Sequence, residues 1–200
     1  MALPEDDPKT NPRVRLREEK VLSDAWYLLR SFTFDFQGSD GEWTEQRREV
    51  YDRGNGATIL LRDEQRGTVL LTRQFRLPAY LNGHPDGMLL EAPAGLLDDE
   101  DAETAIRREA EEETGYRVDA VRQIGDYFMS PGSVTERIAF FTGTYRAGER
   151  VSQGGGVASE GEDIEIVEVT LGEAIAMVEQ GEIVDAKTVL LLLFAERLAT

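Results

Sequence analysis

The feature that most constrains this chain is a dense acidic run in a helical stretch, RREAEEETGY, at residues 107–116. A charge run on a helix usually forms a solvated face. The phase of this helix indicates otherwise. At about 100° per residue, the small and apolar stripe that includes Ala105 and Ile106 continues onto Glu109 and Glu113. Two carboxylates therefore lie where the core-facing stripe is expected to continue.

Two inward carboxylates one helical turn apart predict a metal site. Residues four apart on a helix have Cβ atoms about 5–6 Å apart, so the charges of Glu109 and Glu113 repel each other. A divalent cation between them removes this repulsion, and hard cations such as Mg²⁺ prefer carboxylate oxygens. Glu111 falls on the opposite side of the helix and is expected to face solvent.

The ends of this helix carry their own signals. It is expected to run from about Asp101 to Thr114, with Asp98 or Asp99 as the N-cap. Gly115 follows at the position where a left-handed residue commonly ends a helix.

Charge and composition exclude several classes of function. The formal net charge is −17, which argues against binding a nucleic acid polymer but not against a small anionic substrate next to a cation. The longest apolar run, 189–195, is too short for a bilayer, which needs about 20 residues. The N-terminus has no apolar secretion signal, so we expect a cytoplasmic protein that acts on no membrane.

The N-terminal part of the chain predicts a small β-sheet. Residues up to about 13 are expected to be a tail, and phenylalanines alternate with polar residues between Trp26 and Phe36. With a returning strand at 43–51, this predicts an antiparallel β-meander that must pack on the main domain or on a partner subunit. We expect an N-terminal subdomain at 1–53 and a main domain at 54–200.

The remaining elements alternate in a mixed order that predicts an α/β (α+β) fold with a mixed sheet. Strands are expected in the stretches 57–63, 68–76, 88–95, 116–127, 137–146 and 164–170, and two terminal helices after them. The stretches 77–87 and 152–163 are expected to be loops, and the glycines of the second are expected to make it mobile. His84, in the first loop, is expected to be solvated.

The strand, turn and acidic helix together resemble the Nudix box. The pattern of that family is matched by Glu100, then after seven residues Arg108 and Glu109, followed by Ala110, Glu112, Glu113, Gly115 and Tyr116. One position departs from the pattern, because Ala94 stands where the family has its first glycine and Gly95 comes one residue later. The resemblance implies a Nudix α/β/α sandwich that hydrolyses a nucleoside diphosphate linked to another group, with Mg²⁺ or Mn²⁺.

The same resemblance implies roles for the residues of the box. Glu109 and Glu113 would be the principal metal ligands, and Glu112 a further ligand. The main-chain carbonyl of Ala94 would add a ligand, although the shifted glycine leaves open whether Gly95 supplies it instead. Arg108 would pair with Glu100 and hold the loop against the helix.

Further stretches resemble one branch of the family. MSPGSVTE at 129–136 and EAPAGLL at 91–97 are typical of Nudix enzymes that act on nucleoside diphosphate sugars. Together with REVYDRGNGATILL at 48–61 and DAKTVLLL at 185–192, they resemble the GDP-mannose pyrophosphatase branch. ADP-ribose pyrophosphatases share much of this layout and remain the alternative.

In that branch, the substrate would be bound by residues outside the box. Arg48 and Glu49 on the N-terminal sheet, and Arg76 on a strand of the main domain, would contact the nucleotide sugar. Lys187 would lie near it. Taken alone, Arg76 is equally well a surface ion pair, and Lys187 a lysine on a solvated helix start. Trp26 is more often core than a stacking platform.

The general base is expected on a loop. Glu162, on the glycine-rich stretch that also carries Glu160 and Asp163, is expected to act as the base or as an added metal ligand. Glu136 is its rival, in a position that would also contact substrate.

The expected function is Mg²⁺-dependent cleavage of GDP-mannose by a homodimer that pairs through its N-terminal sheet. A Nudix-fold ligand sensor without catalysis is the alternative from another class. The intact set of Glu109, Glu112 and Glu113 argues against it.

Overall fold

The structure is a computed structural model that describes residues 11–98, 100–157, 159 and 161–199. The chain divides into two compact units. The first contains the residues up to Arg53 together with Ser130–Glu136, and the second contains Gly54–Met129 and the chain from Arg137 onward. Tyr51 ties the separate segment to the first unit, because its N–H donates to the Ser133 carbonyl at 2.8 Å. The first unit therefore includes a loop distant from it in sequence.

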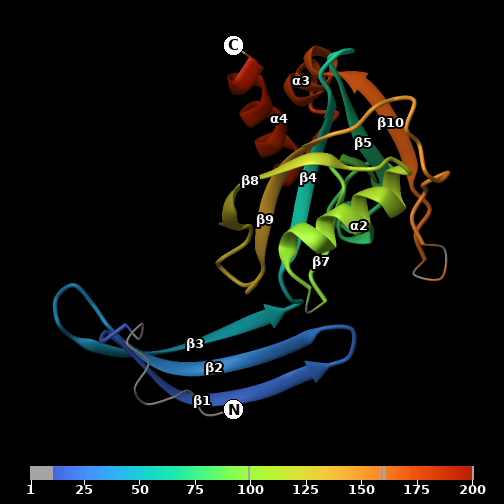
Figure 1. The fold of residues 1–200 in the computed structure, drawn as a ribbon. Helices are drawn as coiled ribbons and strands as arrows, with labels where there is room; N and C mark the ends of the chain where they lie inside the picture. The colour runs from blue at the N-terminus through green and yellow to red at the C-terminus, as the bar shows by residue number, and fades with distance from the viewer. Residues whose placement is uncertain (1–10, 99, 158, 160, 200) are drawn as a thin grey trace. The chain divides into compact units, whose positions relative to one another are not determined.

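The first unit is a three-stranded antiparallel sheet in the order β1–β2–β3 (Figure 1). Its strands are β1 (Val14–Asp24), β2 (Leu28–Gln37) and β3 (Trp43–Asp52). The meander expected from the phenylalanine alternation is thus present. β1 was not expected, because its residues are exposed at nearly every position and carry no period-two apolar signal.

The buried face of β2 differs from the expectation. Ser31 and Asp35 are buried. The three phenylalanines of this strand, Phe32, Phe34 and Phe36, are only half-buried. Arg47 donates to the Ser31 hydroxyl at 2.7 Å, and Arg17 forms an ion pair with Asp35. A single sheet has no second layer to cover aromatic rings, so long arginine side chains cover one face instead. Trp26 is 83% exposed and is not a core residue.

The second unit is built on a seven-stranded mixed sheet (Figure 1). The main order is β10–β5–β4–β9–β8, while β6 pairs with β5 and β7 pairs with β4. β4 and β9 run parallel, and the other pairs are antiparallel. The strands are β4 (Gly56–Asp63), β5 (Thr68–Phe75), β6 (Met88–Glu91), β7 (Ala94–Leu96), β8 (Asp119–Phe128), β9 (Arg137–Thr144) and β10 (Glu165–Thr170).

The described residues of this unit form four α-helices: α1 (Leu77–Leu81), α2 (Ala102–Thr114), α3 (Leu171–Gln180) and α4 (Ala186–Ala199). α1 lies in a stretch expected to be a loop. Its start suits Pro78, because proline has no N–H to lose in the first turn of a helix. His84 follows this helix half-buried, and its Nδ1 accepts a hydrogen bond from Gly87 N at 3.1 Å. It is therefore less solvated than expected.

Alternate residues of the central strands pack into two separate hydrophobic cores, one on each face of the sheet. Ile59 and Leu61 of β4 pack with Ile106 of α2 on one face of the sheet. Leu60, between them, packs with Leu191 of α4 on the other face. Helices on both faces of a mixed sheet confirm the α/β/α sandwich (Figure 1). Within the described residues, no helix has the length and apolarity needed to cross a membrane.

Candidate active site

Helix α2 begins and ends where a short polar residue and a glycine allow it. The N-cap is Asp101, whose side chain accepts from Thr104 N at 3.1 Å. The expectation of Asp98 was therefore wrong, because that residue lies before the helix with a φ of 41°; Asp99 lies outside the described residues. Gly115 is the C-cap in the left-handed conformation, as expected.

The two glutamates assigned to the inner face do point into the unit. Glu113 is 1% exposed, and its Oε2 is buried without a hydrogen-bond partner among the described residues. Burial raises the pKa of Glu113 well above the ordinary value, and the negative charges of Glu162 and Glu109 raise it further. An unpartnered buried carboxylate oxygen is costly, and a cation beside it would remove that cost.

Glu109 shares this environment one helical turn earlier. Burial raises its pKa to about 7, although the Arg108 guanidinium 3.0 Å away acts in the opposite direction. Glu112 and Glu162 add to the rise through their negative charges. Glu111 is half-buried rather than fully exposed.

Arg108 forms ion pairs with other acidic residues of the box. It bonds to Glu100 at 3.2 Å, which is the expected pair, and to Glu112 at 3.1 Å. In the part of the chain that the structure describes, no three acidic or histidine side chains are arranged to hold a metal ion as they stand. The donors are nonetheless all hard oxygens, and Glu113 has an unused one. Oxygen donors of this kind suit a hard divalent cation.

The turn before α2 contains the shifted glycine, Gly95, and pairs with β4. A Cβ on Gly95 would lie 2.2 Å from Cδ of Glu109, so the Glu109 side chain lies directly against Gly95. Pro93 O accepts from Ile59 N at 3.0 Å. Because carbonyl directions alternate along a strand, Gly95 O is directed toward β4 like Pro93 O, and Ala94 O is directed away. The Ala94 carbonyl therefore does not point toward β4, and its role as a metal ligand stays a prediction.

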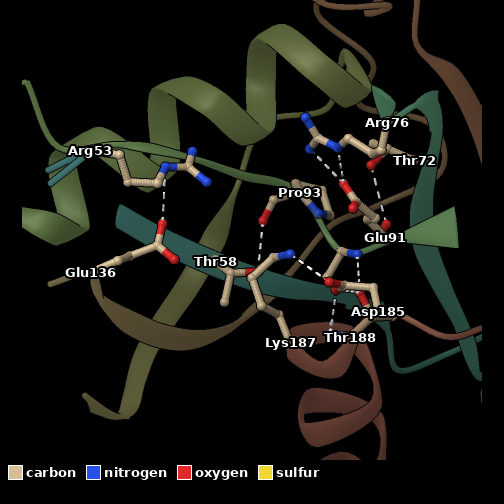
Figure 2. A network of polar contacts seen from close by, with 11 residues as sticks. Arg53, Thr58, Thr72, Arg76, Glu91, Pro93, Glu136, Asp185, Lys187 and Thr188 are labelled. Atoms are coloured by element: carbon tan, nitrogen blue, oxygen red, sulfur yellow. Dashed lines mark hydrogen bonds and ion pairs between the residues drawn. The ribbon is translucent and has the colours of Figure 1, made fainter. Parts of the chain in front are cut away.

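Arg76 is held by a buried carboxylate that sequence reasoning missed. Its Nε and Nη2 lie 3.0 Å and 2.6 Å from one oxygen of Glu91, which is 4% exposed (Figure 2). Arg76 itself remains partly exposed. One side of the guanidinium is thus fixed while the other N–H groups stay available. A glutamate at the end of the apolar strand MLLE was the only sequence signal for this partner.

Lys187 is embedded in a network rather than solvated. Its Nζ lies 2.6 Å from Oδ1 of Asp185, and the lysine side chain is only 17% exposed (Figure 2). The other oxygen of Asp185 accepts from Thr188 N and Oγ1 at 3.0 and 2.8 Å. Thr188 Oγ1 in turn accepts from Ala92 N at 2.6 Å. The start of α4 is therefore bonded to the connection between β6 and β7.

The remaining expected site residues fall into two groups. Glu162 lies in the second unit, where its Oε2 accepts from Val157 N at 2.9 Å; Glu160 lies outside the described residues. Glu136, Arg48 and Glu49 belong to the first unit. Glu136 pairs with Arg53 at 3.4 Å. Arg48 donates to Gln46 Oε1 at 3.0 Å, and Glu49 is exposed.

Comparisons with known proteins agree with this geometry. Residues 52–192 match the family model described as NUDIX domain, and residues 13–51 match the one described as GDP-mannose pyrophosphatase NudK N-terminal domain. The chain is a member of the Nudix family and is a pyrophosphohydrolase.

Similar relatives carry a more specific name. A GDP-mannose pyrophosphatase of Pectobacterium atrosepticum is 55% identical over 88% of this chain and 90% of its own length. One of Yersinia enterocolitica is 54% identical over 88% and 92%. A solved structure titled as an ADP compounds hydrolase matches 94% of this chain and 95% of its own with a TM-score of 0.72. At 16% identity, that likeness shows the fold alone.

Proposed function

We propose that this protein hydrolyses the pyrophosphate bond of GDP-mannose to GMP and mannose 1-phosphate. The observation that carries the proposal is the identity of more than half of the aligned residues, over about nine tenths of both chains, with proteins named GDP-mannose pyrophosphatase. The likeness includes the N-terminal sheet and is not confined to the box. Identity this extensive supports a shared substrate, not only a shared reaction type.

The proposed cofactor is Mg²⁺, with Mn²⁺ as the alternative. Glu109 and Glu113 would hold it, with Glu112, Glu162 and the Ala94 carbonyl as further ligands. Bound there, the metal neutralises the pyrophosphate and lowers the pKa of an attacking water. The buried, unpartnered Oε2 of Glu113 supports this assignment, because a cation is what such an oxygen lacks.

The second unit supplies two cations for the substrate. Arg76 is clamped by Glu91 on one side, so its remaining N–H groups are oriented without a further loss of side-chain entropy. Lys187 is held by Asp185 near the β6–β7 connection. We propose that both bind the diphosphate. The contribution of Arg48, Glu49 and Glu136 to substrate binding stays a prediction.

For the general base we favour Glu162. It belongs to the same unit as the metal helix, and its charge acts on both Glu109 and Glu113. Glu136 remains the rival. The comparison is kcat for Glu162→Gln against kcat for Glu136→Gln: a much larger loss for the Glu136 variant would reverse the assignment.

The substrate assignment is tested with a panel. Purified protein is incubated with Mg²⁺ and GDP-mannose, ADP-ribose or another nucleoside diphosphate sugar, and kcat/KM is compared. GDP-mannose is expected to give the highest value. A higher value for ADP-ribose would move the assignment to that substrate, and no turnover of any member by folded protein would favour a non-catalytic sensor.

We also propose a homodimer that pairs through the three-stranded sheet, in the cytoplasm. The sheet exposes apolar side chains, among them Leu16, Val21, Leu22 and Trp26. Edge strand β1, and edge strand β3 apart from Tyr51, also leave backbone groups available for pairing. Light scattering after size exclusion should give about twice the chain mass of 22.4 kDa. A mass equal to one chain at micromolar concentration would refute the dimer.

A further inference from the structure

A glycine-containing segment, residues 150–157, packs against the end of the helix that carries the metal ligands. We call it the glycine strap. Gly155 N donates to the Glu113 carbonyl at 2.9 Å, and Gly156 N donates to the Glu112 carbonyl at 3.2 Å. The last carbonyls of a helix have no partner within the helix. The strap therefore supplies hydrogen-bond partners for the carbonyls of Glu112 and Glu113, two of the glutamates proposed to hold the metal.

The strap is held at this place by several contacts. Val151 N and Ser152 N donate to Gly115 O at 2.7 and 3.2 Å. Arg150 donates to the Gln153 carbonyl, and its guanidinium lies 5.6 Å from the ring centre of Tyr116. The glycines of this segment predict mobility. The segment is hydrogen-bonded to the end of α2 on both sides of Gly154, through residues 151–152 and residues 155–156.

The contact requires glycine at a particular position. Gly154 has a φ of 64°, and a Cβ there would lie 2.6 Å from the carbonyl carbon of Thr114 and 2.8 Å from Glu113 O. These are backbone atoms and cannot turn away as a side chain can. Gly115 has the same restriction from the other side, since its Cβ would lie 2.5 Å from Ser152 O. A side chain at either position would separate strap and helix.

The strap also contacts the carboxylate of Glu162, which is proposed as the base. Val157 N donates to Glu162 Oε2 at 2.9 Å. A Cβ on Gly156 would lie 2.4 Å from the same oxygen, so the carboxylate rests directly on the strap. One continuous set of backbone contacts therefore connects the end of α2 to Glu162.

We propose that the glycine strap is a positioning element, in which Gly154 fixes the distance between Glu162 and the glutamates of α2. This inference rests on the proposed function for the role of Glu162. Because the strap bonds to the carbonyls of Glu112 and Glu113, a shift of the helix end moves the strap and the base with it. The spacing of the carboxylates is thereby kept when a metal or substrate binds.

The chain offers a matched pair of substitutions for the test. Gly154→Ala and Gly161→Ala both place an alanine at a positive φ, 64° and 79°. At Gly161, however, a Cβ would meet no atom within 4 Å. Backbone strain is common to both variants, and only Gly154→Ala separates strap from helix. We expect kcat to fall about a hundredfold in Gly154→Ala, since misplacement by about 1 Å can have that effect, and to change less than about threefold in Gly161→Ala.

A double-mutant cycle with Glu162→Gln distinguishes positioning from general damage. If Gly154 acts through Glu162, Gly154→Ala lowers kcat little further in the Glu162→Gln background. Losses that multiply, or equal losses in the two glycine variants, would overturn the proposal. Should Gly154→Ala fail to fold, Arg150→Ala loosens the strap without touching α2, and about a tenfold loss, again absent in the Glu162→Gln background, is expected.

A second readout does not depend on turnover. Titration calorimetry with MgCl₂ should show Mg²⁺ binding about tenfold weaker in Gly154→Ala than in wild type, and unchanged within about twofold in Gly161→Ala. Unchanged Mg²⁺ affinity in a folded Gly154→Ala protein would contradict the strap. Failure of the proposed function would show differently, as absence of GDP-mannose hydrolysis in the wild type.

Discussion

The almost fully buried Glu91 holds Arg76 from one side, with Nη2 2.6 Å and Nε 3.0 Å from a single carboxylate oxygen. A buried carboxylate without its cation is costly, and an arginine without its clamp must lose more freedom on binding an anion. With the role proposed for Arg76, the pair links the stability of the fold to recognition of the diphosphate.

Replacing the clamp should therefore affect both properties. In Glu91→Gln we expect KM for GDP-mannose to rise about tenfold and the free energy of unfolding to fall by about 1–3 kcal/mol. Steady-state kinetics and urea unfolding measure the two effects. Glu165→Gln is the control, because Glu165 pairs with partly exposed Arg73 at 3.5 Å and should change stability by less than about 0.5 kcal/mol. An unchanged KM in Glu91→Gln would show that Arg76 needs no clamp.

Glu109 makes the stability of the metal-free protein depend on pH. Its pKa in the folded chain is about 7 against an ordinary 4.5, so the folded chain keeps a proton that the unfolded chain releases. The stabilisation is fully present below pH 4.5 and is lost as the pH rises through 7. Between pH 5 and 8 in EDTA, the wild type should lose about 2 kcal/mol more than Glu109→Gln. Equal losses in the two proteins would contradict the buried placement of Glu109.

Metal binding should restore the stability that is lost when Glu109 ionises at high pH. A ligand that binds only the folded state at about a hundred times its Kd stabilises by about 2.7 kcal/mol. MgCl₂ should therefore raise the Tm of the wild type at pH 8 by several degrees, and raise that of Glu109→Gln much less. Glu111→Gln lies on the same helix with its side chain away from the inner stripe, and should respond like the wild type. If MgCl₂ also fails to raise the Tm of Glu111→Gln, Mg²⁺ binds through the overall negative charge of the helix and not at a specific site.

Lys187 offers a test of substrate binding that leaves the metal untouched. Lys187→Met removes a cation that is proposed to bind the diphosphate, while Asp185 keeps its bonds to Thr188. We expect KM to rise about tenfold with kcat changed by less than about threefold. A large fall in kcat at constant KM would instead assign Lys187 to the chemical step.

The features predicted from the sequence are those carried by local periodicity. The inner face of α2 follows from the spacing of Ala105, Ile106, Glu109 and Glu113, and the structure buries all four to a large extent. β1 was not predicted because its exposed residues show no alternation of apolar and polar side chains. The N-cap was misplaced, since several aspartates precede the helix and only the fold selects Asp101.

Long-range pairs could not be predicted in this way. Glu91 pairs with Arg76, 15 residues earlier, and Ala92 bonds to Thr188, 96 residues later. Composition also did not predict the contacts of the glycine strap. Glycines predict mobility when read alone, but here Gly154 is required by a close backbone approach to Thr114. Such requirements depend on what lies opposite, and the local sequence does not contain that information.

The most direct test of the whole account follows the products of one reaction in three proteins. With Mg²⁺ and GDP-mannose, the wild type should yield GMP and mannose 1-phosphate in equal amounts, resolved by phosphorus NMR. Glu113→Gln should lose turnover by at least about a thousandfold while remaining folded, and Glu111→Gln should keep it. Full activity in Glu113→Gln, or no GMP from the wild type, would contradict the assignment of this helix as the metal-binding centre of a GDP-mannose hydrolase.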